Sequence, residues 1–275
     1  MLRARPLAVI LAAPVREQPV PYAQRVTPAL VGEPVDLPLR GELRYACELA
    51  RLVCDPAFLR PGPQVDAPPV LLVPGFMAGD ASLAVLRDWL RRRGSRAASA
   101  RMRLNVDCAE RTVGRLEGHL RSLVEGTGRR GVVIGQSRGG ELARVLAVRN
   151  PDVVGALVML GSPVLEPLSV GRPVLTALRS VARLGDLGVP GTFSTQCADG
   201  ECCAAFRADL TARLAPEVHA VAIYSRSDGI VSWRACLDPE ARHVEVESSH
   251  AGMSVNRAVY QVLTEILEEE TAWSS

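Results

Sequence analysis

Short, continuous apolar runs alternate along this chain with longer segments in which apolar residues recur at helical spacing. Continuous runs rich in valine, isoleucine and leucine are typical of strands buried on both faces of a parallel sheet. We expect such strands at residues 70–73, 131–135, 153–160, 219–224 and 244–246, with an edge strand within 96–102.

The segments between these runs predict amphipathic helices. In residues 81–94, Leu83, Leu86, Trp89 and Leu90 share one face, and Gly94 is the expected C-cap. Further helices are expected over 41–59, 110–125, 141–150, 174–184 and 256–269. Because strands and helices alternate, the connections are crossovers, which predicts an α/β fold with a mainly parallel, doubly wound sheet.

One interval breaks this alternation. Between Ser162 and Glu217 no segment resembles a sheet strand, so we predict a helical lid insertion over about 162–217 that lies across the strand ends. Residues 1–40 are rich in proline and lack periodicity, and they are expected to form an irregular N-terminal arm. Residues 41–275 are then a single α/β domain that contains the insertion.

The composition is that of an ordinary globular protein, with 275 residues, 48% of them apolar and 23% charged. The net charge of +2 gives no reason to expect a nucleic-acid partner. No apolar run approaches the roughly 20 residues of a transmembrane helix. The start MLRARPLAVILAAP resembles a weak secretion signal, but Pro14 interrupts it, so we expect a cytoplasmic protein with secretion as the alternative.

Seven cysteines, an odd number, argue against a full disulfide framework. The adjacent pair Cys202 and Cys203 departs from the Cys-x2-Cys spacing that zinc sites favour, so no metal site is expected. A local disulfide that involves Cys236 and buried free thiols remain the alternatives for the C-terminal group, Cys197, Cys202, Cys203 and Cys236. Cys47 and Cys54 lie seven apart on a predicted helix and are expected in the core.

The stretch GVVIGQSRGG places Ser137 in the turn between a predicted strand and a predicted helix, with Gly135 and Gly139 on either side. A turn of this kind presents the serine hydroxyl at the carboxyl end of the strand. The following backbone N–H and the helix N-terminus both favour negative charge at that point. Ser137 is therefore the candidate nucleophile, and a glycine-rich turn of purely structural use is the alternative.

A serine nucleophile requires a base, and the chain has four histidines. His119 lies within a predicted helix, and His219 and His243 lie at or near strand starts, which face the wrong edge of a parallel sheet. His250, in SSHAGM, follows the last predicted strand and comes after the serine. His250 is therefore the candidate base.

A carboxylate that orients the base is expected at the end of the preceding strand. Asp228, in YSRSDG, occupies that position, and Asp199 and Asp209 in the insertion rank below it. Asp228 has the alternative of serving only as a helix N-cap for the segment that starts at Ile230.

An oxyanion hole requires two backbone donors. One is expected in the turn after the strand 70–73, where the Phe76 amide is the first choice and the Met77 amide the second. The Arg138 amide, next to the serine, is the other.

These segments together resemble the α/β-hydrolase superfamily, with VVIGQSRGG as nucleophile elbow, LLVPGF as oxyanion loop, YSRSDGIV carrying the acid and ESSHAGM carrying the base. The resemblance covers roughly residues 65–270 and extends to bacterial lipase- and esterase-like hydrolases. Two positions differ from many relatives, since Pro74-Gly75 stands where they have His-Gly and Gln136 stands where they have histidine.

The resemblance implies the α/β-hydrolase fold and a serine hydrolase that cleaves carboxylic esters through an acyl-enzyme, with no metal and no organic cofactor. The expected substrate is a small apolar ester or acyl compound. An acyltransferase or thioesterase that acts on a biosynthetic intermediate is one alternative, and a catalytically silent ligand-binding member is another. Arg138 and Arg226 near the mouth of the site raise the further hypothesis of an acidic substrate.

Several apolar side chains of the insertion have two possible roles. They are expected either to contact an apolar acyl chain of the substrate or only to pack the lid against the body. They are Val170, Val174, Leu175, Leu178 and Val181.

Overall fold

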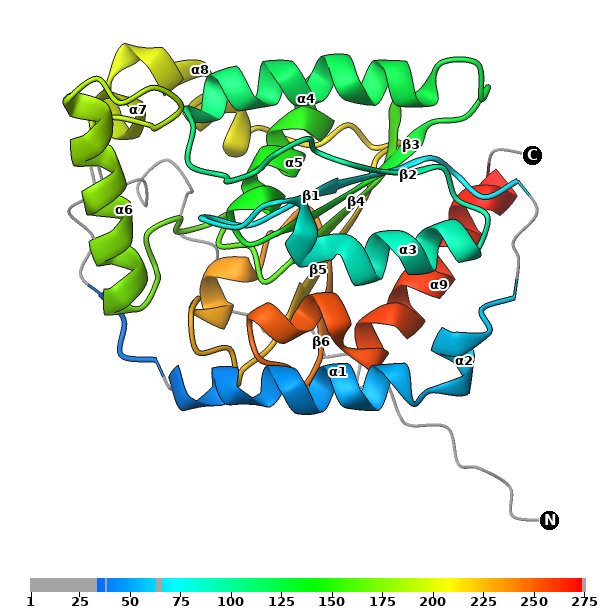
Figure 1. The fold of residues 1–275 in the computed structure, drawn as a ribbon. Helices are drawn as coiled ribbons and strands as arrows, with labels where there is room; N and C mark the ends of the chain where they lie inside the picture. Colours follow the sequence, from blue (N-terminus) through cyan, green and yellow to red (C-terminus); the bar gives the residue numbers. More distant parts are fainter. Residues whose placement is uncertain (1–33, 38, 63–65, 274–275) are drawn as a thin grey trace.

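The computed structural model describes residues 34–37, 39–62 and 66–273, and its centre is a six-stranded sheet in the order β2-β1-β3-β4-β5-β6 (Figure 1). Every neighbouring pair is parallel, as expected. The strands are β1 (Val70–Val73), β2 (Ala97–Ser99), β3 (Gly131–Gln136), β4 (Val154–Leu160), β5 (His219–Tyr224) and β6 (Arg242–Glu245). The strand order reverses between β1 and β3, and open α/β sheets bind ligands at the carboxyl ends of strands at such a point.

Helices cover both faces of the sheet (Figure 1). One face packs against α4 (Ala109–Val124), α5 (Arg138–Arg149) and α8 (Ala204–Leu210), and the other packs against α1 (Tyr45–Val53), α3 (Ala84–Arg92) and α9 (Arg257–Trp273). Alternate strand residues serve the two layers, so Leu71 and Val133 belong to the α4–α5 side while Leu72 and Ile134 belong to the α3–α9 side. Both faces being buried explains why the strands are continuous apolar runs, and the predicted doubly wound arrangement is confirmed.

The single helix expected over 41–59 is divided into a 3-10 helix (η2, Leu39–Arg44), α1 and α2 (Pro56–Leu59). The division at Asp55 has a local cause. The Asp55 carboxylate accepts a hydrogen bond from the Ala57 N–H at 2.9 Å, and Pro56 occupies the first helical position, so a new helix begins there.

The expected burial of Cys47 and Cys54 is wrong, because both are exposed. Glu48 and Leu52, which are buried, form the inner side of α1 and leave the two cysteines outside. Cys236 is buried and carries a free thiol, so it takes part in no disulfide.

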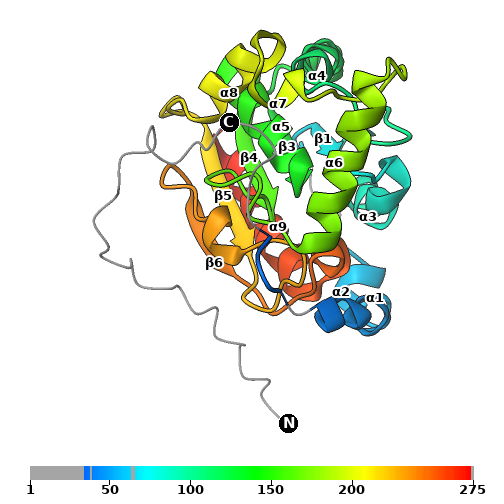
Figure 2. The ribbon, with the colours of Figure 1, turned by 90° about the vertical axis from the view of Figure 1, so that its left-hand side faces the viewer.

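Between β4 and β5 the described chain forms helices and no sheet strand, in agreement with a helical insertion. The elements are α6 (Arg172–Asp186), α7 (Gln196–Asp199), a 3-10 helix (η4, Glu201–Cys203) and α8. Figures 1 and 2 show α6 at one end of the sheet, apart from the two helical layers. An isolated bridge joins Val170 to Val231, just beyond β5, which places the start of α6 at the carboxyl ends of the strands.

Most of the expected N-terminal arm, including the stretch that resembles a secretion signal, lies outside the described residues. Its described end runs beside the insertion, where Val35 forms a bridge to Gly171 and its N–H donates to the Val170 carbonyl at 3.1 Å. Within the described residues, no helix has the length and apolar character needed to cross a membrane.

A buried ion pair ties α5 to the segment between β5 and β6. The Arg144 Nε donates to Asp238 Oδ2 at 2.6 Å, and the two side chains are only 4% and 1% exposed. Further hydrogen bonds satisfy the pair, since Arg144 also donates to the Ala212 carbonyl at 3.0 Å and Asp238 accepts the Glu240 N–H at 3.0 Å.

We expect Asp238→Asn to lower the free energy of unfolding by about 3–5 kcal/mol, because it leaves the Arg144 charge buried without a counter-charge. Asp88→Asn, which removes the exposed partner of Arg87, is the control and should cost less than about 1 kcal/mol. Urea unfolding followed by circular dichroism measures both. Equal losses for the two variants would contradict this account of the buried pair.

Candidate active site

Ser137 lies in a sharp turn between β3 and α5 with φ of 53° and ψ of −126°. The turn depends on the two flanking glycines. A Cβ at Gly135 would overlap the Gly139 backbone, and a Cβ at Gly139 would overlap the Val73 carbonyl. The Ser137 N–H donates to the Leu160 carbonyl at 2.8 Å, which anchors the strained residue to the end of β4.

The Ser137 side chain is half-buried, and its hydroxyl has no hydrogen-bond partner among the described residues. The loop after β1 lies directly against it, because a Cβ at Gly75 would be 3.2 Å from the Ser137 Cβ. The serine is thus placed beside the loop from which the sequence predicts an oxyanion donor.

The amides around the serine differ in availability. The Met77 N–H donates to the Asn105 carbonyl at 3.3 Å, whereas the Phe76 N–H has no acceptor within the described part of the chain. Arg138 is the first residue of α5, and the N–H groups of a first turn lack intrahelical acceptors. The hydrogen bonds therefore favour Phe76 over Met77 as the partner of Arg138.

Asp228 and His250 are in direct contact, and both side chains are buried. The His250 Nδ1 lies 2.7 Å from Asp228 Oδ2, so Nδ1 carries the proton and Nε2 keeps a lone pair. The other oxygen, Oδ1, accepts the N–H groups of Ile230 and Val231, each at 2.8 Å. Asp228 therefore caps the following segment and orients the imidazole at the same time.

The loops that carry Ser137 and His250 lie at the same edge of the sheet, at the carboxyl ends of β3 and β4. Gln136, the residue before the serine, donates its side-chain N–H to the His250 carbonyl at 3.0 Å. A Cβ at Gly161 would lie 3.1 Å from His250 Nδ1, and Gly161 directly follows Leu160, the acceptor of the Ser137 N–H.

The remaining histidines and the alternative aspartates have other partners or positions. His219 opens β5, with its Nδ1 2.5 Å from Glu270 Oε1, and His243, near the start of β6, has its Nε2 2.7 Å from the Asp238 carbonyl. His119 lies within α4, Asp209 pairs with Arg149 at 2.6 Å, and Asp199 is exposed on α7.

Glu42, a residue of η2 that no sequence motif marks, binds both loops of the acid–base pair. Its carboxylate accepts the N–H of Gly229 at 3.1 Å, of His250 at 2.9 Å and of Ala251 at 3.1 Å. One side chain thereby holds both Gly229, the residue after Asp228, and His250 itself.

Glu48 on α1 holds the loop before the histidine in the same way. It is 4% exposed, and it accepts the Ser249 N–H at 2.8 Å, the Ser249 hydroxyl at 3.0 Å and the Ser248 hydroxyl at 3.2 Å. No sequence pattern marks either glutamate, because acidic residues on a helix ordinarily face solvent. The only local sign is that Glu48 falls on the apolar side of α1, four residues before Leu52.

The net effect of these surroundings is a raised pKa for His250. Burial by itself lowers the pKa of the imidazole, but the Asp228 charge, the hydrogen bond to Asp228 and the Glu42 charge outweigh it. The protonated form of His250 is therefore stabilised inside the fold.

The two arginines singled out for an acidic substrate are engaged within the protein. Arg138 donates to the Asn105 carbonyl at 3.0 Å and to the Asp107 carbonyl at 2.7 Å, and its guanidinium lies 5.2 Å from the centre of the Phe193 ring. The Arg226 Nε lies 3.2 Å from the Glu245 carboxylate, and its guanidinium lies over Trp233. These contacts remove the support for an acidic substrate.

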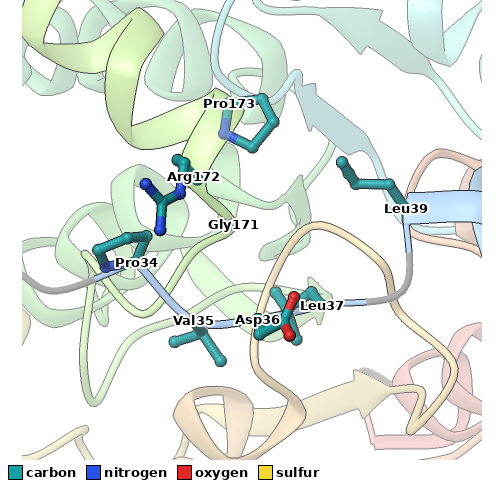
Figure 3. A pocket seen from close by; sticks show the side chains of 8 residues that line it. All are labelled: Pro34, Val35, Asp36, Leu37, Leu39, Gly171, Arg172 and Pro173. Carbon is teal, nitrogen blue, oxygen red and sulfur yellow. The ribbon is translucent and has the colours of Figure 1, made fainter.

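A cavity of about 310 Å³ lies between the described start of the chain and the start of α6 (Figure 3). Ser137, Asp228 and His250 do not line it. Its lining residues are Pro34, Val35, Asp36, Leu37, Leu39, Gly171, Arg172 and Pro173. This cavity is separate from the candidate catalytic residues.

No protein-family model and no curated protein sequence matches this chain. Solved structures do. The mature form of lipase BlEst2 from Bacillus licheniformis superposes with a TM-score of 0.55 at 15% identity, over 75% of this chain and 94% of that one. The propeptide form of the same lipase gives the same score and identity, and the match spans about half of its length (51%).

At this level of identity the likeness establishes the architecture. With its parallel six-stranded sheet, its two helical layers and this match, the protein has the α/β-hydrolase fold.

We expect His250 to titrate above its ordinary value of 6.5, and Asp228→Asn to bring its pKa below that value, because burial then dominates. Glu42→Gln should lower the pKa by a smaller amount. Two-dimensional NMR of histidine-labelled protein, with the His250 signal assigned by loss in His250→Gln, measures all three.

The sign of the linkage follows from the raised pKa. The stability that His250 contributes is fully present below pH 6.5 and is lost as the pH rises through the folded-state pKa. A wild-type value at or below 6.5 would contradict this account.

Proposed function

We propose that the protein is a serine hydrolase that cleaves carboxylic esters, with Ser137 as nucleophile, His250 as base and Asp228 as the orienting acid. The observation that carries the proposal is the strained turn of Ser137 at the edge of the sheet where a buried aspartate holds the Nδ1 of His250 at 2.7 Å. A structural turn has no need of a non-glycine residue at φ of 53°, whereas an exposed nucleophile does.

In the proposed reaction, Ser137 Oγ attacks the carbonyl carbon of the ester while His250 Nε2 takes its proton. The negative charge that develops on the carbonyl oxygen is stabilised by the Phe76 amide, in the loop after β1, and by the Arg138 amide, at the start of α5. His250 then gives the proton to the departing alcohol, which leaves an acyl group on Ser137.

The second half repeats these roles with water as the nucleophile. His250 takes a proton from the water as its oxygen attacks the acyl carbon, and it returns that proton to Ser137 as the acid is released. Asp228 keeps Nδ1 protonated throughout and stabilises the imidazolium. The raised pKa of His250 has the direction that suits a group required to hold a proton within each half-reaction.

The partly buried apolar side chains of the insertion support an apolar substrate. Val170, Leu175 and Val181 are buried and pack the insertion against the body, while Val174 and Leu178 are only partly buried.

Leu178 belongs to the same apolar cluster as Phe76 and Phe193, beside the proposed oxyanion loop. We therefore propose that an apolar acyl chain lies between Leu178 and Phe76. The lipase named among the solved structures of this fold agrees with that substrate class.

We expect Ser137→Ala to abolish labelling by a fluorophosphonate probe and to lower kcat for p-nitrophenyl esters by about 10⁴-fold or more, since the nucleophile is removed. Asp228→Asn should lower kcat on the order of 10³–10⁴-fold, because the imidazole loses its orientation. Ser180→Ala, an exposed serine on α6, is the matched control and should leave both unchanged.

The pattern of results distinguishes the alternatives. Labelling that depends on Ser137, together with release of acid from an acyl chain-length series, supports ester hydrolysis. Labelling with no hydrolysis, but with acyl transfer to an added alcohol or amine, would replace the proposal with an acyltransferase. An unlabelled wild type that still binds the esters would indicate a ligand-binding protein.

A further inference from the structure

Four cysteines from two distant parts of the chain meet beside the active-site region. Cys108 lies at the N-cap of α4, Cys197 lies on α7, and Cys202 and Cys203 end η4 in the insertion. Their four sulfur atoms all lie within 4.8 Å of one another. Cys108 and Cys203 are buried, Cys197 is half-buried and Cys202 is exposed.

The spacing of the sulfurs is that of ligands around one ion. The Sγ atoms of Cys108 and Cys203 are 3.4 Å apart, those of Cys197 and Cys202 are 3.5 Å apart, and those of Cys202 and Cys203 are 3.8 Å apart. A tetrahedron with zinc–sulfur bonds of about 2.3 Å has edges of about 3.8 Å. A disulfide bond is about 2.05 Å long, and all four cysteines are free.

Backbone N–H groups contact two of the four sulfurs. The backbone N–H of Glu110, in the first turn of α4, donates to the Cys203 sulfur, and that of Ser194 donates to the Cys197 sulfur. Hydrogen bonds of this kind stabilise sulfur ligands and fix their orientation. The N-terminus of α4 adds a favourable partial positive charge.

Positive side chains also surround the cluster. Arg138 and Arg111 are close enough to interact electrostatically with its sulfurs, and Arg207 donates to the carbonyls of Gly200 at 2.8 Å and Cys197 at 3.4 Å. A divalent ion with four thiolates has a net charge of −2, which these cations offset.

We propose that Cys108, Cys197, Cys202 and Cys203 form a tetrahedral site for one thiophilic divalent metal ion, with zinc as the expected occupant. Four protein ligands fill the coordination shell, so the ion would be structural. The site joins the start of α4 to the insertion, and it is separate from the proposed hydrolase chemistry.

The adjacent pair Cys202 and Cys203 does not predict a zinc site from the sequence, because a pattern of neighbouring residues cannot include the distant Cys108. The fold supplies that ligand, and it places the metal close to the residues that flank Ser137. The Phe193 N–H donates to the Val106 carbonyl at 2.7 Å, and Phe193 lies beneath Arg138. The ion would therefore hold this part of the insertion against the oxyanion side of the site.

The test begins with the full chain, purified under reducing conditions and analysed by inductively coupled plasma mass spectrometry. We expect about one zinc ion per chain. Replacement by cobalt(II) should give intense sulfur-to-cobalt charge-transfer bands and the visible bands of a tetrahedral ion. Removal of the ion by a chelator should make the four thiols reactive toward a thiol reagent and lower Tm.

Cys202→Ser is the main variant, because that ligand is exposed and its replacement leaves the core intact. It should lose zinc at least tenfold more readily to a competing chelator, and Cys197→Ser should do the same. Cys47→Ser and Cys54→Ser, also exposed, are the matched controls and should keep the ion.

Two results would overturn the proposal. One is wild-type protein that contains no metal and gives no tetrahedral cobalt spectrum. The other is a peptide map of the unreduced protein that contains disulfides among these four cysteines. Iron in place of zinc, lost from the same variants, would support the site and change its occupant. None of these measurements depends on ester hydrolysis.

Discussion

The candidate site depends on one constraint, which is that positions 135 and 139 are glycines and carry no side chain. They allow α5 to start directly against the ends of β1 and β3, where a Cβ at Gly139 would overlap the Val73 carbonyl. Any side chain there would displace α5, and with it both Ser137 and the Arg138 N–H. The strained φ of Ser137 costs on the order of 1–3 kcal/mol. Complete burial of Leu142, Val145 and Leu146 on α5 offsets that cost.

The acid and base depend on a part of the chain that lies far from them in sequence. The Asp228 side chain orients the imidazole, while Glu42 and Glu48 hold the backbone on which His250 and its neighbours are carried. Each glutamate accepts three hydrogen bonds, so their carboxylates are well satisfied. The N-terminal helical segment, which precedes the sheet, is for this reason part of the architecture of the site.

What the sequence predicted follows from how far each signal extends along the chain. The apolar runs gave β1 and β5 with their observed bounds, because strands buried on both faces are written as continuous apolar residues. The positions of Ser137, Asp228 and His250 came from strand ends, and the structure places the last two 2.7 Å apart. Their catalytic roles remain a proposal.

Contacts that depend only on tertiary structure had no such signal. Nothing near Glu42 in sequence indicates that it lies beside His250, and nothing near Cys202 indicates Cys108. The break at Asp55 has a local signal, an aspartate followed by proline, which the helical periodicity of 41–59 outweighed. Cys47 is exposed because α1 turns the side that carries Glu48 and Leu52 toward the body of the protein.

The insertion divides into two parts with different attachments. The part from Phe193 to α8 is fixed by the Val106 hydrogen bond, by stacking under Arg138 and, in our proposal, by the metal ion. The other part, α6, packs through apolar contacts, and its last residue, Asp186, accepts hydrogen bonds from the Thr195 N–H and hydroxyl, each at 2.9 Å. Phe76 packs against both parts, because Leu178 of α6 and Phe193 belong to the same apolar cluster.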